Sequence, residues 1–158
     1  MDVMDYLIDL EGKDWAELLS AWRFLLPQSF NVWLVNRVGD VFMVFPDDSV
    51  HMLDVGRGTL ERVADNCDDF VTRLDQDDHT NTWMMVSLVD ACRKAGVPIG
   101  PNQCYGFKIP PMLGGSYEVE NLQPTDLSAH YSLLGEICEQ TRDLPRGTKL
   151  KRIEINEL

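Results

Sequence analysis

Hydrophobic residues in the first part of the chain follow two different spacings. From Asp14 to Leu26 they recur every three or four positions, which predicts an amphipathic helix that stops at Pro27. The spacing then shortens to two, in segments rich in β-branched and aromatic residues at 31–37, 41–45 and 49–54. Short turns containing Gly or Pro separate these segments, so they are predicted to form an antiparallel β-meander.

Helical spacing returns after the predicted meander. Thr59 follows two glycines and is placed as the N-cap of a helix through Ala64. A second helix is predicted from Asn66, with three hydrophobic residues facing inward: Phe70, Val71 and Leu74. A charged connector follows, and a third helix is predicted from Thr80 or Thr82 to Ala95, where Gly96 and Pro98 end it.

The C-terminal part of the chain is less regular. Between Pro98 and Gly115 no period is evident, and such a long irregular segment is either functional or packed against a sheet. A strand is predicted at 116–122, then a helix opened by Pro124 and Asp126, and a final basic strand at 148–155. We therefore expect a single α+β domain over residues 1–158, with a central antiparallel sheet, the β-meander, flanked by helices.

Charge is distributed unevenly along the chain. The net charge is −12, and residues 1–90 hold 18 acidic against 6 basic side chains, whereas residues 91–158 hold 8 of each. Direct binding of nucleic acid is not expected, because it requires a basic surface. The acidic part can steer a basic partner or can simply keep the protein soluble, and the sequence leaves both explanations open.

The sequence predicts a cytoplasmic protein. The N-terminus has no basic region followed by an apolar run, and no stretch is long and apolar enough to span a membrane, so no membrane partner is expected. The four cysteines are widely spaced without a Cys-x-x-Cys pair, as expected of free thiols in a reducing compartment: Cys67, Cys92, Cys104 and Cys138.

No pattern typical of a cofactor or metal site is present. The three histidines are not spaced as metal ligands, and the acidic run 75–78 lacks the glycine and the closing glutamate of a calcium loop. Cys104 is weighed as a nucleophile, although a packed thiol is the favoured interpretation. We therefore predict a non-enzymatic protein without cofactor or metal.

One run of residues is specific enough to suggest a family. The segment from Gly100 to Leu122 reads GPNQCYGFKIPPMLGGSYEVENL, and a Leu144-Pro145 helix end and a Gly147-Thr148 step follow it. This run resembles the C-terminal domain of Tdi-type immunity proteins of type VI secretion. Residues 1–78 resemble the GAD-like part that commonly precedes that domain, which would then occupy residues 79–158.

The resemblance implies an antidote that binds and neutralises a cognate type VI-secreted toxin, a nuclease. It implies no catalytic residues. The motif positions are interpreted either as fold determinants or as part of the interface: Cys104, Tyr105, Phe107, Pro110, Gly114, Gly115, Tyr117 and Asn121.

An acidic cluster is the hypothesis for the toxin-binding face. A nuclease presents a basic cleft to phosphate, and an acidic partner can occupy that cleft. Six aspartates crowd the predicted second helix and the loop after it: Asp65, Asp68, Asp69, Asp75, Asp77 and Asp78. The alternative function is a non-catalytic regulatory or scaffolding module that binds other proteins.

Overall fold

A four-stranded antiparallel sheet forms the centre of the fold. The computed structural model describes residues 2–76 and 79–144. The strands pair in the order β1-β2-β3-β4, and their bounds are Asn31–Val35, Val41–Val44, Val50–Asp54 and Thr59–Ala64. The strands that the period-two pattern predicts are β1, β2 and β3, so the predicted meander is confirmed and extended by a fourth strand.

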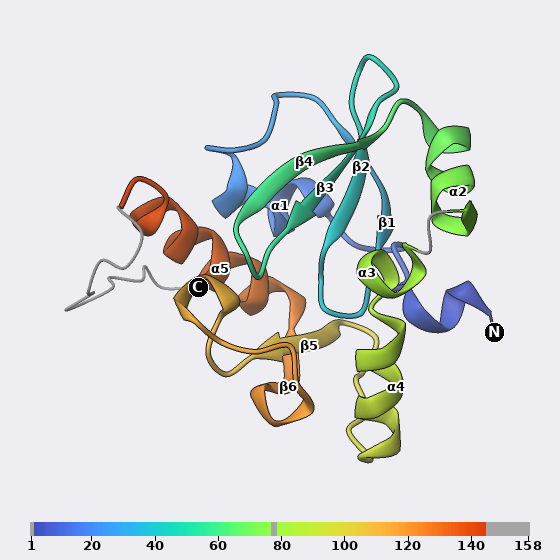
Figure 1. The fold of residues 1–158 in the computed structure, drawn as a ribbon. Helices are drawn as coiled ribbons and strands as arrows, with labels where there is room; N and C mark the ends of the chain where they lie inside the picture. Colours follow the sequence, from blue (N-terminus) through green and yellow to red (C-terminus); the bar gives the residue numbers. More distant parts are fainter. Residues whose placement is uncertain (1, 77–78, 145–158) are drawn as a thin grey trace.

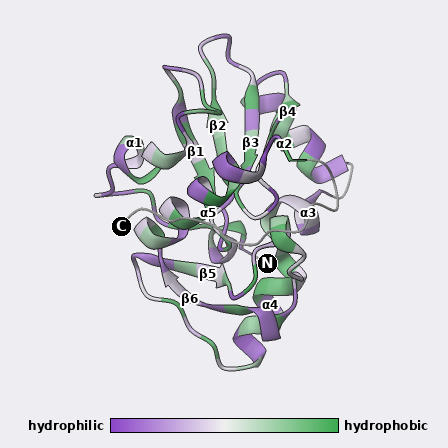
Figure 2. Ribbon diagram, turned by 90° about the vertical axis from the view of Figure 1, so that its left-hand side faces the viewer, coloured by the Kyte–Doolittle hydropathy of each residue, from purple (hydrophilic) through white to green (hydrophobic). Residues whose placement is uncertain are grey.

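The sheet is buried on both faces at its centre. Three consecutive residues of β2 (Val41, Phe42 and Met43) are fully buried, which requires cover on either side. Phe42 packs edge-on against Phe70 at 5.2 Å and against Trp83 at 6.1 Å between ring centroids. Figure 2 shows hydrophobic residues concentrated along the central strands.

Helices at the two ends of the chain meet beside the sheet. The chain begins with a 3₁₀ helix η1 (Val3–Tyr6), the short helix α1 (Trp15–Leu18) and a second 3₁₀ helix η2 (Ser20–Trp22). The indole N–H of Trp22 donates to the carbonyl of Tyr131 in the long helix α5 (Leu127–Thr141) at 3.0 Å. The prediction of a continuous helix over 14–26 is therefore wrong. Helix α1 ends at Leu18, and η2 then directs the side chain of Trp22 toward α5.

Three helices follow the sheet: α2 (Cys67–Gln76), α3 (Thr80–Met84) and α4 (Val86–Lys94). The single helix predicted from Thr80 is broken, because Met85 adopts a left-handed conformation with φ of 56°. The side chain of Asn81 supports the break by accepting the backbone N–H of Ser87 at 2.8 Å. The predicted end of α4 is confirmed, since Gly96 has a positive φ of 75°.

A separate hairpin closes the lower part of the molecule (Figure 1). Strand β5 (Gln103–Phe107) pairs antiparallel with β6 (Leu122–Asp126), and the 3₁₀ helices η3 (Pro111–Leu113) and η4 (Val119–Asn121) lie between them. The segment predicted to be irregular thus contains β5. The strand predicted at 116–122 is displaced and starts at Leu122. In both ribbon views α5 lies between the hairpin and the four-stranded sheet.

One predicted helix is a strand. Residues 59–64 form β4, which pairs with β3 through Asp54↔Thr59 and Leu53↔Leu60. The pairing decides the conformation here, because the two glycines that suggested a helix start instead build the β3–β4 turn. Gly58 has a φ of 73°, a left-handed value that favours glycine. The strand predicted at 148–155 lies outside the described residues.

Candidate functional site

The outward side of α2 carries part of the predicted acidic cluster. Asp68 and Asp75 are exposed, and Val71 between them keeps 49% of its surface exposed. Their spacing of three and four residues places the three side chains on one stripe, which we call the α2 face. The inward orientation predicted for Val71 is therefore wrong, whereas Phe70 is buried and stacks on Trp83.

Two other aspartates of the cluster are engaged in contacts within the chain. Asp69 accepts the backbone N–H of Asp65 at 2.8 Å and forms an ion pair with Arg73 at 3.0 Å. Asp65 pairs with Arg62 at 2.9 Å. The pKa of Asp69 is lowered, mainly by the hydrogen bond from the Asp65 N–H and then by the one from Arg73. Asp69 therefore stabilises the first turn of α2. Asp77 and Asp78 lie outside the described residues.

The first motif residues belong to the core. Cys104, Tyr105 and Phe107 of β5 are all buried, and the Tyr105 hydroxyl donates to the carbonyl of Val97 at 2.7 Å. Burial raises the pKa of the Cys104 thiol far above its ordinary value. A nucleophilic cysteine needs the opposite shift, so the environment of Cys104 does not activate it.

The remaining motif residues shape residues 108–121, which we call the motif loop. The carbonyl of Pro110 accepts the N–H groups of Leu113 and Gly115 at 2.8 and 3.0 Å. Gly114 has a φ of 97°, and a Cβ on Gly115 would lie 1.6 Å from the carbonyl oxygen of Ile109. The bend at Gly114 and Gly115 is thus a backbone requirement, and the side chain of Asn121 holds its base together.

Tyr117 joins the motif loop to the β3–β4 turn. The guanidinium of Arg57 lies 4.6 Å from the centroid of the Tyr117 ring and forms an ion pair with Asp54 at 3.0 Å. Burial, followed by the charges of Asp40 and Asp54, raises the pKa of Tyr117 well above its ordinary value, so its hydroxyl is neutral at physiological pH. A Cβ on Gly56 would lie 2.7 Å from this hydroxyl, and glycine lets the ring approach the turn.

A buried carboxyl group lies under this cluster. Asp40 is 1% exposed; its carboxylate oxygens accept the Val55 N–H and the Asn36 side-chain N–H, both at 3.1 Å. Burial and the nearby charge of Asp54 raise the pKa of Asp40 to about 8. His130 is also buried, and burial lowers its pKa to about 4 while its ring is 2.9 Å from the carbonyl of Val38.

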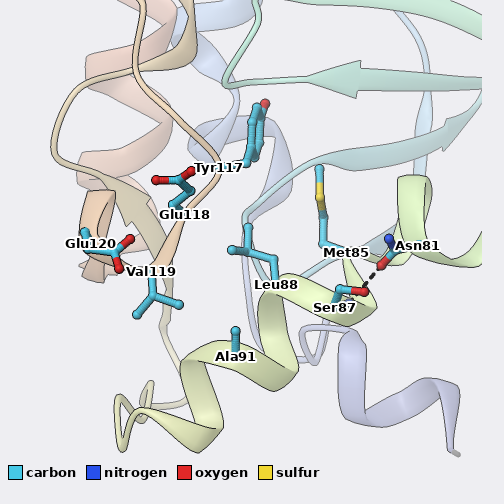
Figure 3. A pocket seen from close by; sticks show the side chains of 9 residues that line it. All are labelled: Asn81, Met85, Ser87, Leu88, Ala91, Tyr117, Glu118, Val119 and Glu120. Atoms are coloured by element: carbon cyan, nitrogen blue, oxygen red, sulfur yellow. Dashed lines mark hydrogen bonds between the residues drawn. The ribbon is translucent and has the colours of Figure 1, made fainter.

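A groove of about 610 Å³ opens between α4 and the end of the motif loop (Figure 3). One wall comes from α3 and α4 and presents Met85, Leu88 and Ala91. The opposite wall is the segment from Tyr117 to Glu120. Figure 3 shows Glu118, Val119 and Glu120 across the hollow from Leu88 and Ala91; Val119 points toward the level of Ala91, the carboxylate of Glu118 points away from α4, and Tyr117 lies at one end. We call this hollow the α4 groove.

The sequence did not indicate the α4 groove. Leu88 and Ala91 lie within the helix predicted up to Ala95, and the structure leaves Leu88 half-buried and Ala91 exposed. Glu118 and Glu120 lie within the strand predicted at 116–122, whereas in the structure Glu118 precedes η4 and Glu120 belongs to it. The sequence shows that Glu118 and Glu120 alternate with Tyr117 and Val119. This alternation does not show that α4 lies on the opposite side of the groove.

Among residues 2–76 and 79–144, no three His, Cys, Asp or Glu side chains are placed to hold a metal ion. Within the same residues, no helix has the length and apolar character needed to cross a bilayer. The four cysteines are free, and Cys67 is the least buried of them.

Part of the chain is similar to a known protein family. Residues 64–138 match the family model described as T6SS immunity protein Tdi1, C-terminal. No curated protein matches the chain. The crystal structure of Atu4351 from Agrobacterium tumefaciens matches with a TM-score of 0.45 at 15% identity, over 76% of this chain and 60% of that one. The GAD-like character of residues 1–78 stays a prediction.

Proposed function

We propose that this protein binds and neutralises a cognate secreted toxin, and that the toxin is a nuclease, because residues 64–138 match the family model of the C-terminal part of Tdi1 immunity proteins of type VI secretion. The observation behind the proposal is that the matched residues include α2, α4 and the motif loop. All residues that define the α2 face and the α4 groove therefore lie inside the matched range. The chemistry of the toxin is inferred from charge.

Charge supports a basic partner. The net charge is −12, with all of the excess in residues 1–90. A nuclease needs a positive cleft for phosphate, so its active face is attracted to an acidic surface and its association rate falls as salt screens the attraction. Occupation of that cleft by carboxylates would exclude the substrate without any catalysis by the immunity protein.

The α2 face fits this role better than the rest of the acidic cluster. Asp68 and Asp75 have no hydrogen bond or ion pair among the described residues, so their charges are available to a partner. The exposed Val71 between them adds apolar area that a complex would bury. Asp65 and Asp69, by contrast, are compensated by Arg62 and Arg73.

The cytoplasm is the proposed place of action. A toxin delivered into the cell, or made there before secretion, meets the immunity protein in that compartment. Four free cysteines, three of them buried, agree with a reducing environment.

The experiment measures association with the cognate toxin, for which the product of the neighbouring gene is the first candidate. In D68N/D75N, two exposed charges are removed from the α2 face with side chains of the same shape. We expect the association rate at low salt to fall about threefold or more, while the dissociation rate changes less. D126N/D143N, which removes two exposed carboxylates at the ends of the α5 segment, is the matched control.

Two outcomes contradict the proposal at different levels. If the parent protein does not bind the toxin at all, the immunity function is wrong, and a regulatory or scaffolding role takes its place. If the parent binds but both double variants associate equally fast, the function stands and the α2 face is not the binding surface.

A further inference from the structure

The α4 groove has one acidic wall and one largely apolar wall, which ends at the polar side chains of Asn81 and Ser87. Met85, Leu88 and Ala91 on the α4 side offer methyl, methylene and thioether surface. The facing segment sets Val119 between the carboxylates of Glu118 and Glu120, and both glutamates are exposed (Figure 3). A ligand that fills such a hollow must be apolar along its length and positive at one end.

The two carboxylates are uncompensated. Within the described residues, neither Glu118 nor Glu120 forms an ion pair or a side-chain hydrogen bond. Arg57, which stacks on Tyr117 at the end of the groove, is already paired with Asp54. Lys94 follows Ala91 by almost one turn of α4 and is exposed, without an ion pair to either glutamate.

Side chains that combine a long aliphatic stem with a cation are those of lysine and arginine. Their methylene groups lie along apolar surface while the charged end reaches a polar one. In the α4 groove, the stem would cover Leu88 and Val119, and the ammonium or guanidinium would meet Glu118 and Glu120. A groove of about 610 Å³ has room for such a side chain together with the backbone that carries it.

We propose that the α4 groove receives a lysine or arginine side chain of the toxin and anchors it through Glu118 and Glu120. The inference rests on the proposed function, because it assigns a second contact site to the same complex. The α4 groove and the α2 face would contribute to binding in different ways. The α2 face attracts the partner from a distance, whereas the groove holds a desolvated cation and slows its dissociation.

A probe that does not depend on the toxin tests the groove by itself. N-acetyl-arginine methylamide is titrated into the isotope-labelled full chain, and backbone amide shifts are followed by NMR. We expect saturable, millimolar binding, with shifts gathered at Met85, Leu88, Ala91 and residues 118–120. These shifts should be lost in E118Q/E120Q, where the shape of both side chains is kept. Shifts that are absent at these residues, or unchanged in E118Q/E120Q, would overturn the proposal.

The complex provides the second test. E118Q/E120Q should weaken toxin binding about tenfold or more, mainly through faster dissociation. The control E17Q/E139Q removes two exposed glutamates from α1 and α5 and should change the dissociation constant less than threefold. A91K, which places a lysine of the chain's own on the groove wall, should weaken binding like E118Q/E120Q.

The result separates the two levels of the account. If the parent protein binds no toxin, the proposed function is wrong. The titration with N-acetyl-arginine methylamide then still decides whether the α4 groove binds a cationic side chain. A parent that binds, together with groove variants that bind as tightly as the control, overturns the anchor and keeps the immunity function.

Discussion

The side chain of Asn121 forms a closed pair of hydrogen bonds with the backbone of Ile109. Its Oδ1 accepts the N–H of Ile109 at 2.9 Å, and its Nδ2 donates to the carbonyl of Ile109 at 2.8 Å. The same Nδ2 also donates to the carbonyl of Ser116 at 2.8 Å. One amide side chain thus replaces a strand neighbour for Ile109 and ties both ends of the motif loop together.

Replacing Asn121 by aspartate should loosen the loop. N121D keeps the acceptor but turns the donor into a second oxygen that faces two carbonyl groups. Loss of two hydrogen bonds at a partly solvated site is expected to cost about 1–3 kcal/mol. Urea unfolding measures the loss, with N31D on the exposed edge of β1 as control, for which we expect about 0.5 kcal/mol or less. Equal stability of N121D and N31D would mean that the pairing does not contribute to stability.

The two glycines of the loop should respond to alanine unequally. G114A only has to adopt a φ of 97° in open space, which costs on the order of 1 kcal/mol. In G115A the new Cβ would lie 1.6 Å from the carbonyl oxygen of Ile109 and 2.9 Å from Nδ2 of Asn121, so the backbone must move and the amide pairing is lost. Thermal unfolding of both variants should give a clearly larger decrease for G115A. The opposite order would show that the loop opens easily.

Period-two spacing and turn residues were sufficient to predict β1, β2 and β3. Each of these strands is rich in β-branched and aromatic residues, and short turns that contain Gly or Pro join it to its neighbour in the sheet. They were not sufficient for β4, where Leu60 and Val63 fit a helix as well as a strand and pairing with β3 decides. The break at Met85 was equally hidden, since it depends on a left-handed residue for which glycine and asparagine are the usual indicators.

The candidate site was predictable only where local chemistry defines it. The acidic α2 is visible in the sequence, and so is the need for glycine in the motif loop. The α4 groove depends on how η4 lies across from α4, and the compensation of Asp65 depends on Arg62 in the preceding strand. Contacts between elements of this kind leave no periodic pattern in the chain.

Two buried titratable groups should give stability an unusual dependence on pH. The pKa of Asp40 is raised to about 8, so the folded chain keeps a proton that an unfolded aspartate releases near pH 4, and stability falls as pH rises toward 8. The pKa of His130 is lowered to about 4, so its contribution is lost as pH falls below 6.5. The two effects oppose each other between pH 4 and 6.5, and only the decline due to Asp40 remains from pH 6.5 to 8.

Urea unfolding at a series of pH values checks this expectation. The free energy of unfolding should decrease between pH 6.5 and 8 in the parent, and the decrease should be absent in D40N, which cannot titrate. The comparison uses the slope with pH, so a lower overall stability of D40N does not affect it. A parent profile that rises through this range would show that Asp40 is ionised in the folded protein.

The cysteines should differ in their reactivity toward a thiol reagent. Cys67 is half-buried at the start of α2, whereas Cys92, Cys104 and Cys138 are buried, and burial raises the pKa of all four thiols. We expect slow labelling at Cys67 in the native protein and four reactive thiols after denaturation without reductant. Fast labelling of Cys104 in the native state would contradict its place in the core, and fewer than four thiols would indicate a disulfide.

The most direct test of the central claim is titration of the toxin's nuclease activity. The cognate toxin is held at a fixed concentration with plasmid DNA, and the purified protein is added in increasing amounts. We predict that DNA cleavage falls with each addition and that excess protein abolishes it, while D68N/D75N and E118Q/E120Q require more protein for the same inhibition. Complete cleavage in the presence of excess parent protein would contradict the account.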